Sequence, residues 1–394
     1  MTAAFSNPTV EAASETAQAP STGAGEQGAA APSWRDGRPR IGIHTSTAGE
    51  ASRALDIAAR IGCTALQIFS GSPRMWPRPH QRMVGPAVAR RFRQRRAELR
   101  LGPVAVHANY LINLASADPM VWERSAAAFC DEIVRAVQLG AEYLIVHPGS
   151  PRDAGIGRGI ENVAEGIARA SRDVPEPFSA ALAQGELRVL IENTAGHGTG
   201  LGSRFTELRA MLEECRVRSV APQPGICLDT AHLLAAGFEI RTVEGLDRTL
   251  EEADAAFGLE TVRVVHMNDS KVPLGARRDR HEHIGRGHIG REAFARILAH
   301  ARLRSPDRAF LLETPIDRPG DDRRNVRALW TLLGMEAPVQ KVAGSKAMRL
   351  DMSRPARTSR ARGKLRNRAT QGARRAARNR AARALRRTAA GRPR

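Results

Sequence analysis

The segment VAVHANYLINLASADPMVWERSAAAFCDEIVRAVQLGAEYLIVHPGS (residues 104–150) contains a strand, a helix and a second strand in turn. Two short apolar runs, Val104–His107 and Tyr143–His147, both end in histidine, and the helical pattern Ser125–Leu139 separates them. A crossover helix returns the chain to the same edge of a sheet, so the two strands must run parallel. The segment therefore predicts a parallel α/β fold with both histidines at the carboxyl end of the strands.

The same alternation repeats between about residues 39 and 337. Helical patterns such as Ala51–Ile61 and Arg291–His300 lie between six further runs rich in apolar and β-branched residues. Eight strand–helix units over roughly 300 residues favour a closed (β/α)₈ TIM barrel over an open doubly wound sheet. No GxGxxG follows the first strand, which counts against a dinucleotide-binding fold. We predict a barrel domain over residues 39–340, whose other strands are Ile41–His44, Ala65–Phe69, Val189–Glu192, Gly225–Asp229, Val262–His266 and Ala309–Glu313.

Residues 1–38 differ in composition from this domain. They are rich in Ala, Ser, Thr, Gly and Pro and lack hydrophobic periodicity, which predicts a disordered segment. The first basic residue is Arg35, so we expect neither a signal peptide nor an arginine-rich transit peptide. No apolar run approaches the ~18 residues of a membrane span. The four cysteines form no CxxC pair. We therefore expect a cytoplasmic protein with reduced thiols and no membrane segment.

The positive charge of the chain is concentrated in residues 341–394. This tail holds 19 Lys and Arg residues and one acidic residue, whereas the rest of the chain holds 42 basic and 40 acidic residues. The domain is therefore near neutral, at +2, and the tail carries +18. A disordered Arg/Ala-rich tail of this kind suits a polyanionic partner, either nucleic acid or an anionic membrane surface. The alternative is a solvated tail that only aids solubility.

Ionisable side chains stand at or just beyond the ends of six consecutive predicted strands. A single strand-end histidine is usually a core or capping residue, but burying many ionisable groups together is costly unless something pairs with them. Active sites of TIM barrels lie at this carboxyl-terminal face. The candidate metal ligands here are His107, His147, Glu192, Asp229, His232, His266 and Glu313, with Asp279 and His281 in the loop after strand seven.

Five histidines and four carboxylates, without a cysteine, are donors that suit zinc, with manganese or iron as alternatives. Nine ligands are too many for one tetrahedral ion, and they fit a cluster of about three ions if a carboxylate bridges. Three divalent ions outweigh four carboxylates in charge, so such a site could hold a phosphodiester.

Seven segments of the chain resemble the signatures of the endonuclease IV family, in the family's order. The resemblance covers about residues 40–336. The segments are VHANYLINLAS (106–116), VHPGS (146–150), IENTAGHGTGLGS (191–203), CLDTAHLLAAG (227–237), HMNDSK (266–271), RRDRHEHIGRGHIG (277–290) and LLETP (311–315).

The resemblance implies an apurinic/apyrimidinic (AP) endonuclease of base excision repair with about three zinc ions. It places His107 and His147 on one ion, with Glu192 bridging to a second. Asp229, His266 and Glu313 complete the second site, and His232, Asp279 and His281 hold the third. It also implies hydrolysis of the phosphodiester 5′ to an abasic site, which leaves a 3′-hydroxyl and a 5′-deoxyribose phosphate. Glu192 and Glu313 are the catalytic carboxylates in this interpretation.

The resemblance further predicts residues that fill the gap left by a missing base. They are Arg74 in SGSPRMW (70–76) and Tyr110 with Leu111 in NYLINL (109–114). An aromatic ring can stack on exposed bases while an apolar wedge holds a kink. The alternative is that Tyr110 and Leu111 only pack the loop after strand three.

Several polar residues close to the ligands could support them. Asn193, Asn268 and Lys271 could orient ligands or contact phosphate, and His44 and His283 could orient the ligands as hydrogen-bond donors.

Two other functions remain open from the sequence. One is a sugar isomerase or epimerase of the xylose-isomerase type, which shares the barrel but usually has fewer histidine ligands. The other is a DNA-compacting protein that acts through its tail. We expect double-stranded DNA with abasic sites as the partner, tail contacts to DNA phosphates, a monomer, and a cytoplasmic, nucleoid-associated location.

Overall fold

The computed structural model describes residues 36–47, 49–78 and 82–342. Eight parallel strands form one sheet in the order β1-β10-β7-β6-β5-β4-β3-β2. A parallel bridge between His44 and Gln67 joins the first and last members of this order, so the sheet closes on itself. The predicted TIM barrel is confirmed. The strands are β1 (Arg40–Ile43), β2 (Leu66–Phe69), β3 (Val104–His107), β4 (Tyr143–Val146), β5 (Arg188–Glu192), β6 (Gly225–Asp229), β7 (Val262–His266) and β10 (Ala309–Leu312).

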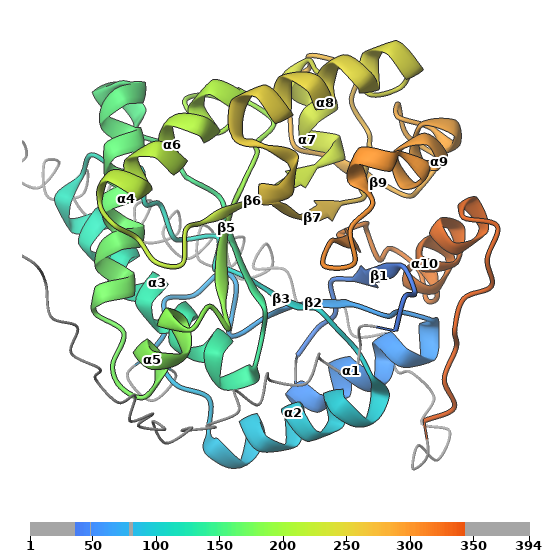
Figure 1. The fold of residues 1–394 in the computed structure, drawn as a ribbon, viewed down its shortest axis with the longest axis horizontal. Coiled ribbons are helices and arrows are strands. Elements are labelled where there is room, and N and C mark those ends of the chain that lie inside the picture. Colours follow the sequence, from blue (N-terminus) through green and yellow to red (C-terminus); the bar gives the residue numbers. More distant parts are fainter. Residues whose placement is uncertain (1–35, 48, 79–81, 343–394) are drawn as a thin grey trace, which may run out of the picture.

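Helices surround the barrel (Figure 1). They bury one face against the strands and expose the other, which is the arrangement that an amphipathic pattern predicts. The helices are α1 (Ala51–Ile61), α2 (Pro86–Leu99), α3 (Pro119–Leu139), α4 (Ile156–Arg172), α5 (Phe178–Ala183), α6 (Phe205–Val217), α7 (Thr230–Ala236), α8 (Val243–Phe257), α9 (Arg291–Ala299) and α10 (Asp321–Leu332), with 3₁₀ turns η2 (Arg152–Ala154), η3 (Leu259–Thr261) and η4 (Ala301–Leu303).

The strand positions agree with the sequence to within one residue at each end. The predicted helix Ser125–Leu139 was too short, because α3 begins at Pro119. The Asp118 side chain accepts hydrogen bonds from the backbone N–H groups of Met120 and Val121, and proline fits the first helical position because it lacks a donor. Two short antiparallel strands of two residues each, β8 (Asp269–Ser270) and β9 (His281–Glu282), follow β7 and were not predicted.

The barrel interior is filled by small and medium apolar side chains. Ala105, Ile145, Leu190, Val264 and Leu311 belong to this inner cluster and are almost fully buried. Each comes from a different strand, at a position with its side chain toward the barrel axis. The packed interior forms a rigid floor beneath the carboxyl-terminal ends of the strands, where the ionisable residues lie.

The two terminal segments of the sequence analysis fall almost wholly outside the described residues. The predicted boundaries at 38/39 and 340/341 therefore stay predictions. Among the helices that the structure describes, none combines the length and the apolar character needed to cross a membrane.

Candidate metal centre

All nine predicted ligands lie at the carboxyl-terminal face of the barrel. His107, Glu192, Asp229 and His266 are the last residues of β3, β5, β6 and β7, whereas His147 and Glu313 each follow a strand by one residue. His232 lies in the first turn of α7, Asp279 is in the loop between β8 and β9, and His281 is the first residue of β9. Glu192, Asp229, His232 and His266 are at most 2% exposed.

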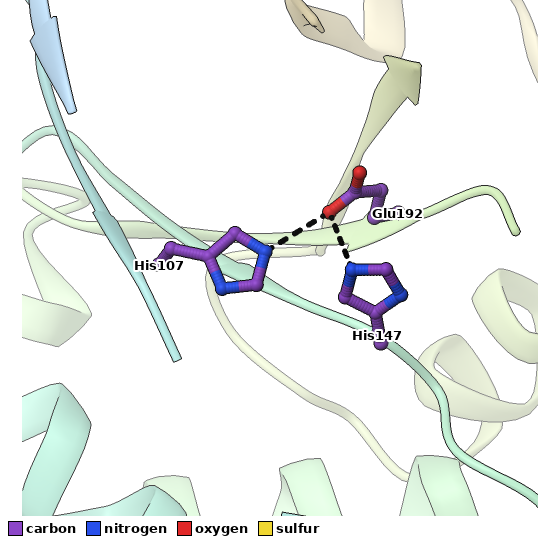
Figure 2. Close-up of side chains that lie close together, drawn as sticks. All are labelled: His107, His147 and Glu192. Atoms are coloured by element: carbon purple, nitrogen blue, oxygen red, sulfur yellow. Dashed lines mark hydrogen bonds and ion pairs between the residues drawn. The ribbon is translucent and has the colours of Figure 1, made fainter. Parts of the chain in front are cut away.

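His107, His147 and Glu192 form the first group of potential ligands (Figure 2). The Nε2 atoms of both histidines lie 3.2 Å from the same Glu192 oxygen, Oε2. Two ligands on a tetrahedral ion with bonds of about 2.0–2.1 Å are about 3.3 Å apart. The three donors therefore stand at the spacing that ligands of one zinc ion would have.

The second group contains Glu192, Asp229, His266 and Glu313. The Nδ1 atom of His266 is 2.9 Å from the other Glu192 oxygen, Oε1. It is also 3.5 Å from Oε2 of Glu313 and 3.8 Å from Oδ2 of Asp229. Because Glu192 presents one oxygen to each group, its carboxylate is placed to bridge them.

The third group lies around His232 and His281, with Asp279 between them. The Asp279 Oδ1 atom is 3.4 Å from His232 Nε2 and 3.1 Å from His281 Nε2. Both Nε2 atoms are buried, and among the described residues neither contact with Asp279 has the geometry of a hydrogen bond. A buried nitrogen without a well-formed hydrogen bond is costly. A metal ion between these side chains would satisfy both nitrogens, so the residues fit the group that the resemblance implies.

Backbone carbonyl groups fix the orientation of three histidine rings. The Nδ1 atoms lie 2.9 Å from Ala108 O for His107, 2.9 Å from Asn193 O for His232 and 3.2 Å from Glu313 O for His281. A carbonyl only accepts, so each Nδ1 carries a proton and donates, and in the neutral ring that binds metal the lone pair is on Nε2. In all three histidines Nε2 faces the carboxylates.

Gln67 is a supporting residue that the sequence analysis missed. It is fully buried in β2, and its Nε2 donates to Glu313 Oε1 at 2.5 Å. Its Oε1 atom lies 2.8 Å from His266 Nε2, and its amide also contacts His44 Nδ1 at 3.0 Å. Gln67 thus fixes His266 with Nδ1 toward the carboxylates. A lone polar residue within the apolar run ALQIF (65–69) was the available signal.

We expect Gln67→Met to weaken zinc binding by about 10–100-fold, because groups that orient metal ligands typically contribute on that scale. A competition titration with a chromophoric chelator measures the affinity. Gln138→Met is the matched control, since Gln138 is a buried glutamine of α3 that bonds the backbone of Val84 instead. Equal zinc affinities of the two variants would contradict this role for Gln67.

Asn193 and Asn268 contact ligands, as the sequence analysis anticipated. Asn268 Nδ2 donates to Asp229 Oδ2 at 2.5 Å, and its Oδ1 accepts from the Glu313 backbone N–H at 2.7 Å. Asn193 Oδ1 accepts from the Asp229 backbone N–H at 2.6 Å. His283 does not reach a ligand and bonds Asn325 instead. Lys271 is exposed, and no side-chain contact to a ligand is found for it.

Asp269 organises the loop that carries Asp279 and His281, and it too was missed. Its buried carboxylate accepts from the backbone N–H groups of Ser270, Gly285, Gly287 and Ile289 at 2.8–3.0 Å. A Cβ atom on Gly287 would lie 2.3 Å from Ser270 O and 2.5 Å from Asp269 Oδ1. Only glycine allows this approach at position 287, and the positive φ of +76° favours glycine at position 285.

Charge and burial together set the protonation of the ion-free site. Burial lowers the pKa of His232, but the Asp229 and Asp279 carboxylates more than offset this and raise it to about 10. The same balance raises the pKa of His281 to about 9. Burial raises the pKa of Glu313, but His266 and the other histidines hold it well below its usual range. Without metal, His232 and His281 are therefore protonated beside the Asp229 and Asp279 carboxylates, whereas burial lowers the pKa of His147.

Zinc binding at pH 7.5 should release at least two protons from the metal-free protein. His232 and His281 are protonated at this pH, because their pKa values of about 10 and 9 lie above it, and both must be neutral to coordinate metal. Apparent affinity should therefore fall as pH falls. Calorimetry in two buffers of different ionisation enthalpy counts the protons. His281→Gln should release one fewer, and a binding enthalpy independent of buffer would contradict the prediction.

Cys227 lies beside Glu192 and His266, within reach of the same site. Burial raises the pKa of its thiol to about 12, which favours the neutral form. A neutral thiol is a poor ligand, since the thiolate binds metal. Cys227 belongs to the inner cluster of the barrel and serves as part of the floor of the site.

Comparison with known proteins decides between the candidate families. A family model described as a xylose isomerase-like TIM barrel matches residues 55–331. A probable endonuclease 4 of Solibacter usitatus is 46% identical over 300 residues, which cover 76% of this chain and 99% of the relative. The chain belongs to the endonuclease IV family. It is a metal-dependent endonuclease that acts on DNA in repair, and the resemblance seen in its sequence is confirmed.

Other comparisons agree with membership of the endonuclease IV family. A probable endonuclease 4 of Methanoculleus marisnigri is 38% identical over 75% of this chain and 99% of its own length. The crystal structure of endonuclease IV from Thermus thermophilus is 38% identical, with a TM-score of 0.63 over 75% of this chain and 99% of that one. A D-tagatose 3-epimerase-like protein, at 18% identity and a TM-score of 0.53, shares the fold alone.

Of the three residues predicted to contact DNA, Tyr110 lies beside the candidate metal centre. Tyr110 is 55% exposed, and its ring packs edge-on against Phe69, with centroids 5.3 Å apart. Its other neighbour is the ring of His107, at 5.7 Å. Arg74 is exposed in the loop between β2 and α2, and Leu111 is half-buried. The exposure of the tyrosine ring leaves it accessible to a base.

Proposed function

We propose that this endonuclease incises DNA at abasic sites, hydrolysing the phosphodiester 5′ to the lesion through a cluster of three zinc ions. The observation that carries the proposal is that nine residues with nitrogen and oxygen donors lie in three groups. Within each group, neighbouring donor atoms are about as far apart as two ligands of one ion would be. Incision would leave a 3′-hydroxyl and a 5′-deoxyribose phosphate.

The nine residues divide among three ions as their distances suggest. His107 and His147 would hold one ion and share Glu192 with the second. Asp229, His266 and Glu313 would complete the second, and His232, Asp279 and His281 the third. Asp229 Oδ2 is also 3.7 Å from His281 Nε2, so this carboxylate could link the second and third groups.

Zinc would supply Lewis acidity, neutralise phosphate oxygens and lower the pKa of water. The protein supplies four carboxylates with a total charge of −4, which three divalent ions would turn into a net +2. Glu192 and Asp229 are buried, Glu313 is half-buried, and the Asp279 side chain is 54% exposed. His147, with 32% of its side chain exposed, lines a cavity of about 430 Å³ that also touches His107, Tyr110 and Asp279. A phosphodiester held in this cavity would lie against ligands of the first group, His107 and His147, and of the third, Asp279.

Recognition of the lesion is assigned to Arg74, Tyr110 and Leu111. Tyr110 is 55% exposed, and its ring lies next to that of His107. If this ring filled the gap left by the missing base, the phosphate of the abasic site would lie near the metal centre. Intact duplex offers no gap for the ring, and inserting it would cost unstacking of a base pair.

Incision of a duplex with one abasic site, before and after chelation, tests the proposal. We expect cleavage on the 5′ side only, loss of activity with the chelator, and recovery when zinc is returned in about three equivalents. The ends of the products identify the bond that is cut. Comparable cleavage of an intact duplex would exclude abasic specificity, and full activity at one zinc per chain would exclude the trinuclear centre.

Replacing Tyr110 and Leu111 together by alanine should weaken the preference for abasic over intact duplex by about 1–3 kcal/mol, the scale of a lost stacking contact. The fold should survive, because Tyr110 is largely exposed and lies in a loop. Competition binding measures the preference. An unchanged preference with a lowered melting temperature would instead assign both residues to packing of the loop.

A further inference from the structure

We propose that Asn109 is a positioning residue that couples the two loops carrying Arg74 and Tyr110–Leu111, so that they meet the abasic site as one rigid unit. This inference rests on the proposed role of those three residues in recognition. We call residues 70–78 the β2 loop and residues 108–118 the β3 loop; each begins directly after its strand.

The Asn109 side chain connects the two loops directly. It is 6% exposed, and its Nδ2 donates to Ser72 O at 2.8 Å and to Met75 O at 2.7 Å, on either side of Arg74. Its Oδ1 accepts from the Leu111 backbone N–H at 2.8 Å, which fixes the turn at the start of the β3 loop. One amide group therefore holds the backbone around both sets of DNA-contacting residues.

A backbone hydrogen bond reinforces the same connection. The Tyr110 N–H donates to Pro73 O at 3.1 Å, so the residue that carries the exposed ring is bonded to the residue preceding Arg74. Among the described residues, this bond and the two from Asn109 are the hydrogen bonds that reach the backbone of residues 72–76 from outside that segment. The middle of the β2 loop therefore depends on the β3 loop for its position.

Side chains of helix α3 make hydrogen bonds to the connection between β2 and α2 both before and after residues 72–76. Ser70 Oγ contacts Glu132 and accepts from Arg135 Nε at 2.8 Å, and both charged residues are buried in α3. At the far end, the Gln138 amide accepts from Val84 N and donates to Val84 O. With both ends fixed, a small shift in the middle decides where Arg74 points.

The Asn109 side chain has no free N–H donor for a phosphate, although it follows His107 by only two residues. Both hydrogens of its Nδ2 are committed to the carbonyl groups of Ser72 and Met75. It lines the 430 Å³ cavity at the metal centre and also a second cavity, of about 810 Å³, beneath the β2 loop. Asn109 thus forms part of the wall between the two cavities, and it acts through the loops.

If the two loops are already fixed before DNA binds, less conformational entropy is lost when they bind the lesion. In this arrangement Arg74 and Tyr110 should contribute cooperatively to recognition, because contact of either side chain with the lesion positions the connected loop that carries the other. Without the amide of Asn109, the β2 loop would lose two of its three bonds to the β3 loop, and the two residues should act independently.

A double-mutant cycle with Arg74→Ala and Tyr110→Ala, measured as preference for abasic over intact duplex, tests this coupling. In the otherwise unchanged protein we expect a coupling of at least about threefold between the two substitutions. In the Asn109→Ala background the coupling should vanish, and the preference itself should fall by about tenfold. Zinc content and single-turnover incision at saturating abasic duplex should change little.

Asn113→Ala is the matched control, because Asn113 lies in the same loop but bonds Ser150 instead of the β2 loop. Its cycle should keep the coupling. Coupling that persists in Asn109→Ala would overturn the inference, as would equal loss in both backgrounds. If Tyr110→Ala and Arg74→Ala each leave the preference unchanged, the proposed recognition role fails instead.

Discussion

The Glu313→Gln protein is expected to incise an abasic duplex at least about a thousandfold more slowly than the unchanged protein. Loss of a single hydrogen bond to the transition state lowers the rate by ~10²–10³-fold, and loss of a metal ligand should cost more. Glutamine keeps the size of the side chain and can keep one oxygen beside Gln67, but it removes the charge. His266 and its neighbours hold the pKa of Glu313 well below its usual range, so the carboxylate is fully ionised at neutral pH. The substitution therefore weakens the second metal group and the positioning of water there.

Binding of abasic duplex by Glu313→Gln should stay close to normal, because Arg74, Tyr110 and Leu111 are unchanged. Single-turnover incision at saturating enzyme separates the chemical step from binding. Glu161→Gln is a matched control, since Glu161 is exposed on α4 and, within the described part of the chain, pairs with Arg158 and with no metal ligand. Near-normal incision by a metal-loaded Glu313→Gln protein would exclude the assigned role of this carboxylate.

The barrel and the location of its metal centre could be predicted because both follow from local patterns. Each strand is a short apolar run, and each is followed by a helix, so the parallel order and the common carboxyl-terminal face follow. His107, Glu192 and His266 could be found as charged residues ending apolar strands. For each of these ligands, the apolar run that identifies it lies within a few residues of it in the sequence.

The residues that support the centre could not be predicted in the same way, because their partners are distant in the chain. Gln67 contacts His266 and Glu313, which are 199 and 246 residues away. Asn109 reaches back to Ser72 and Met75, and its neighbours in the sequence give no hint of this. Only the closure of the barrel, which places β2 beside β1 and β3, brings such side chains to their partners.

The described chain ends on the face of the barrel opposite the metal centre. The Gln340 backbone N–H donates to Ala59 O, and its side chain donates to Leu99 O, at the carboxyl ends of α1 and α2. These helices run antiparallel to the strands, so their ends lie at the amino-terminal side of the sheet. Residues 343–394 follow from there and contain 18 Lys and Arg residues and one Asp.

Deleting residues 343–394 should flatten the salt dependence of binding to intact duplex DNA and weaken binding at low salt. The tail contains no aromatic residue to stack on bases, so we propose that it contacts phosphates and raises non-specific affinity. Each phosphate it neutralises should add about 0.9 to the slope of log K against log salt, so about six contacts would change the slope by about five. Saturated single-turnover incision should not change, because the deletion leaves Gln340 and the metal centre intact.

A salt titration of both proteins on intact duplex measures the slopes. A full-length chain with the seven arginines of RRAARNRAARALRR (374–387) replaced by glutamine separates charge from length, and its slope should lie between the other two. Equal slopes for the full-length and shortened proteins would mean that the tail does not engage DNA, and an anionic membrane or another partner would then be the better hypothesis.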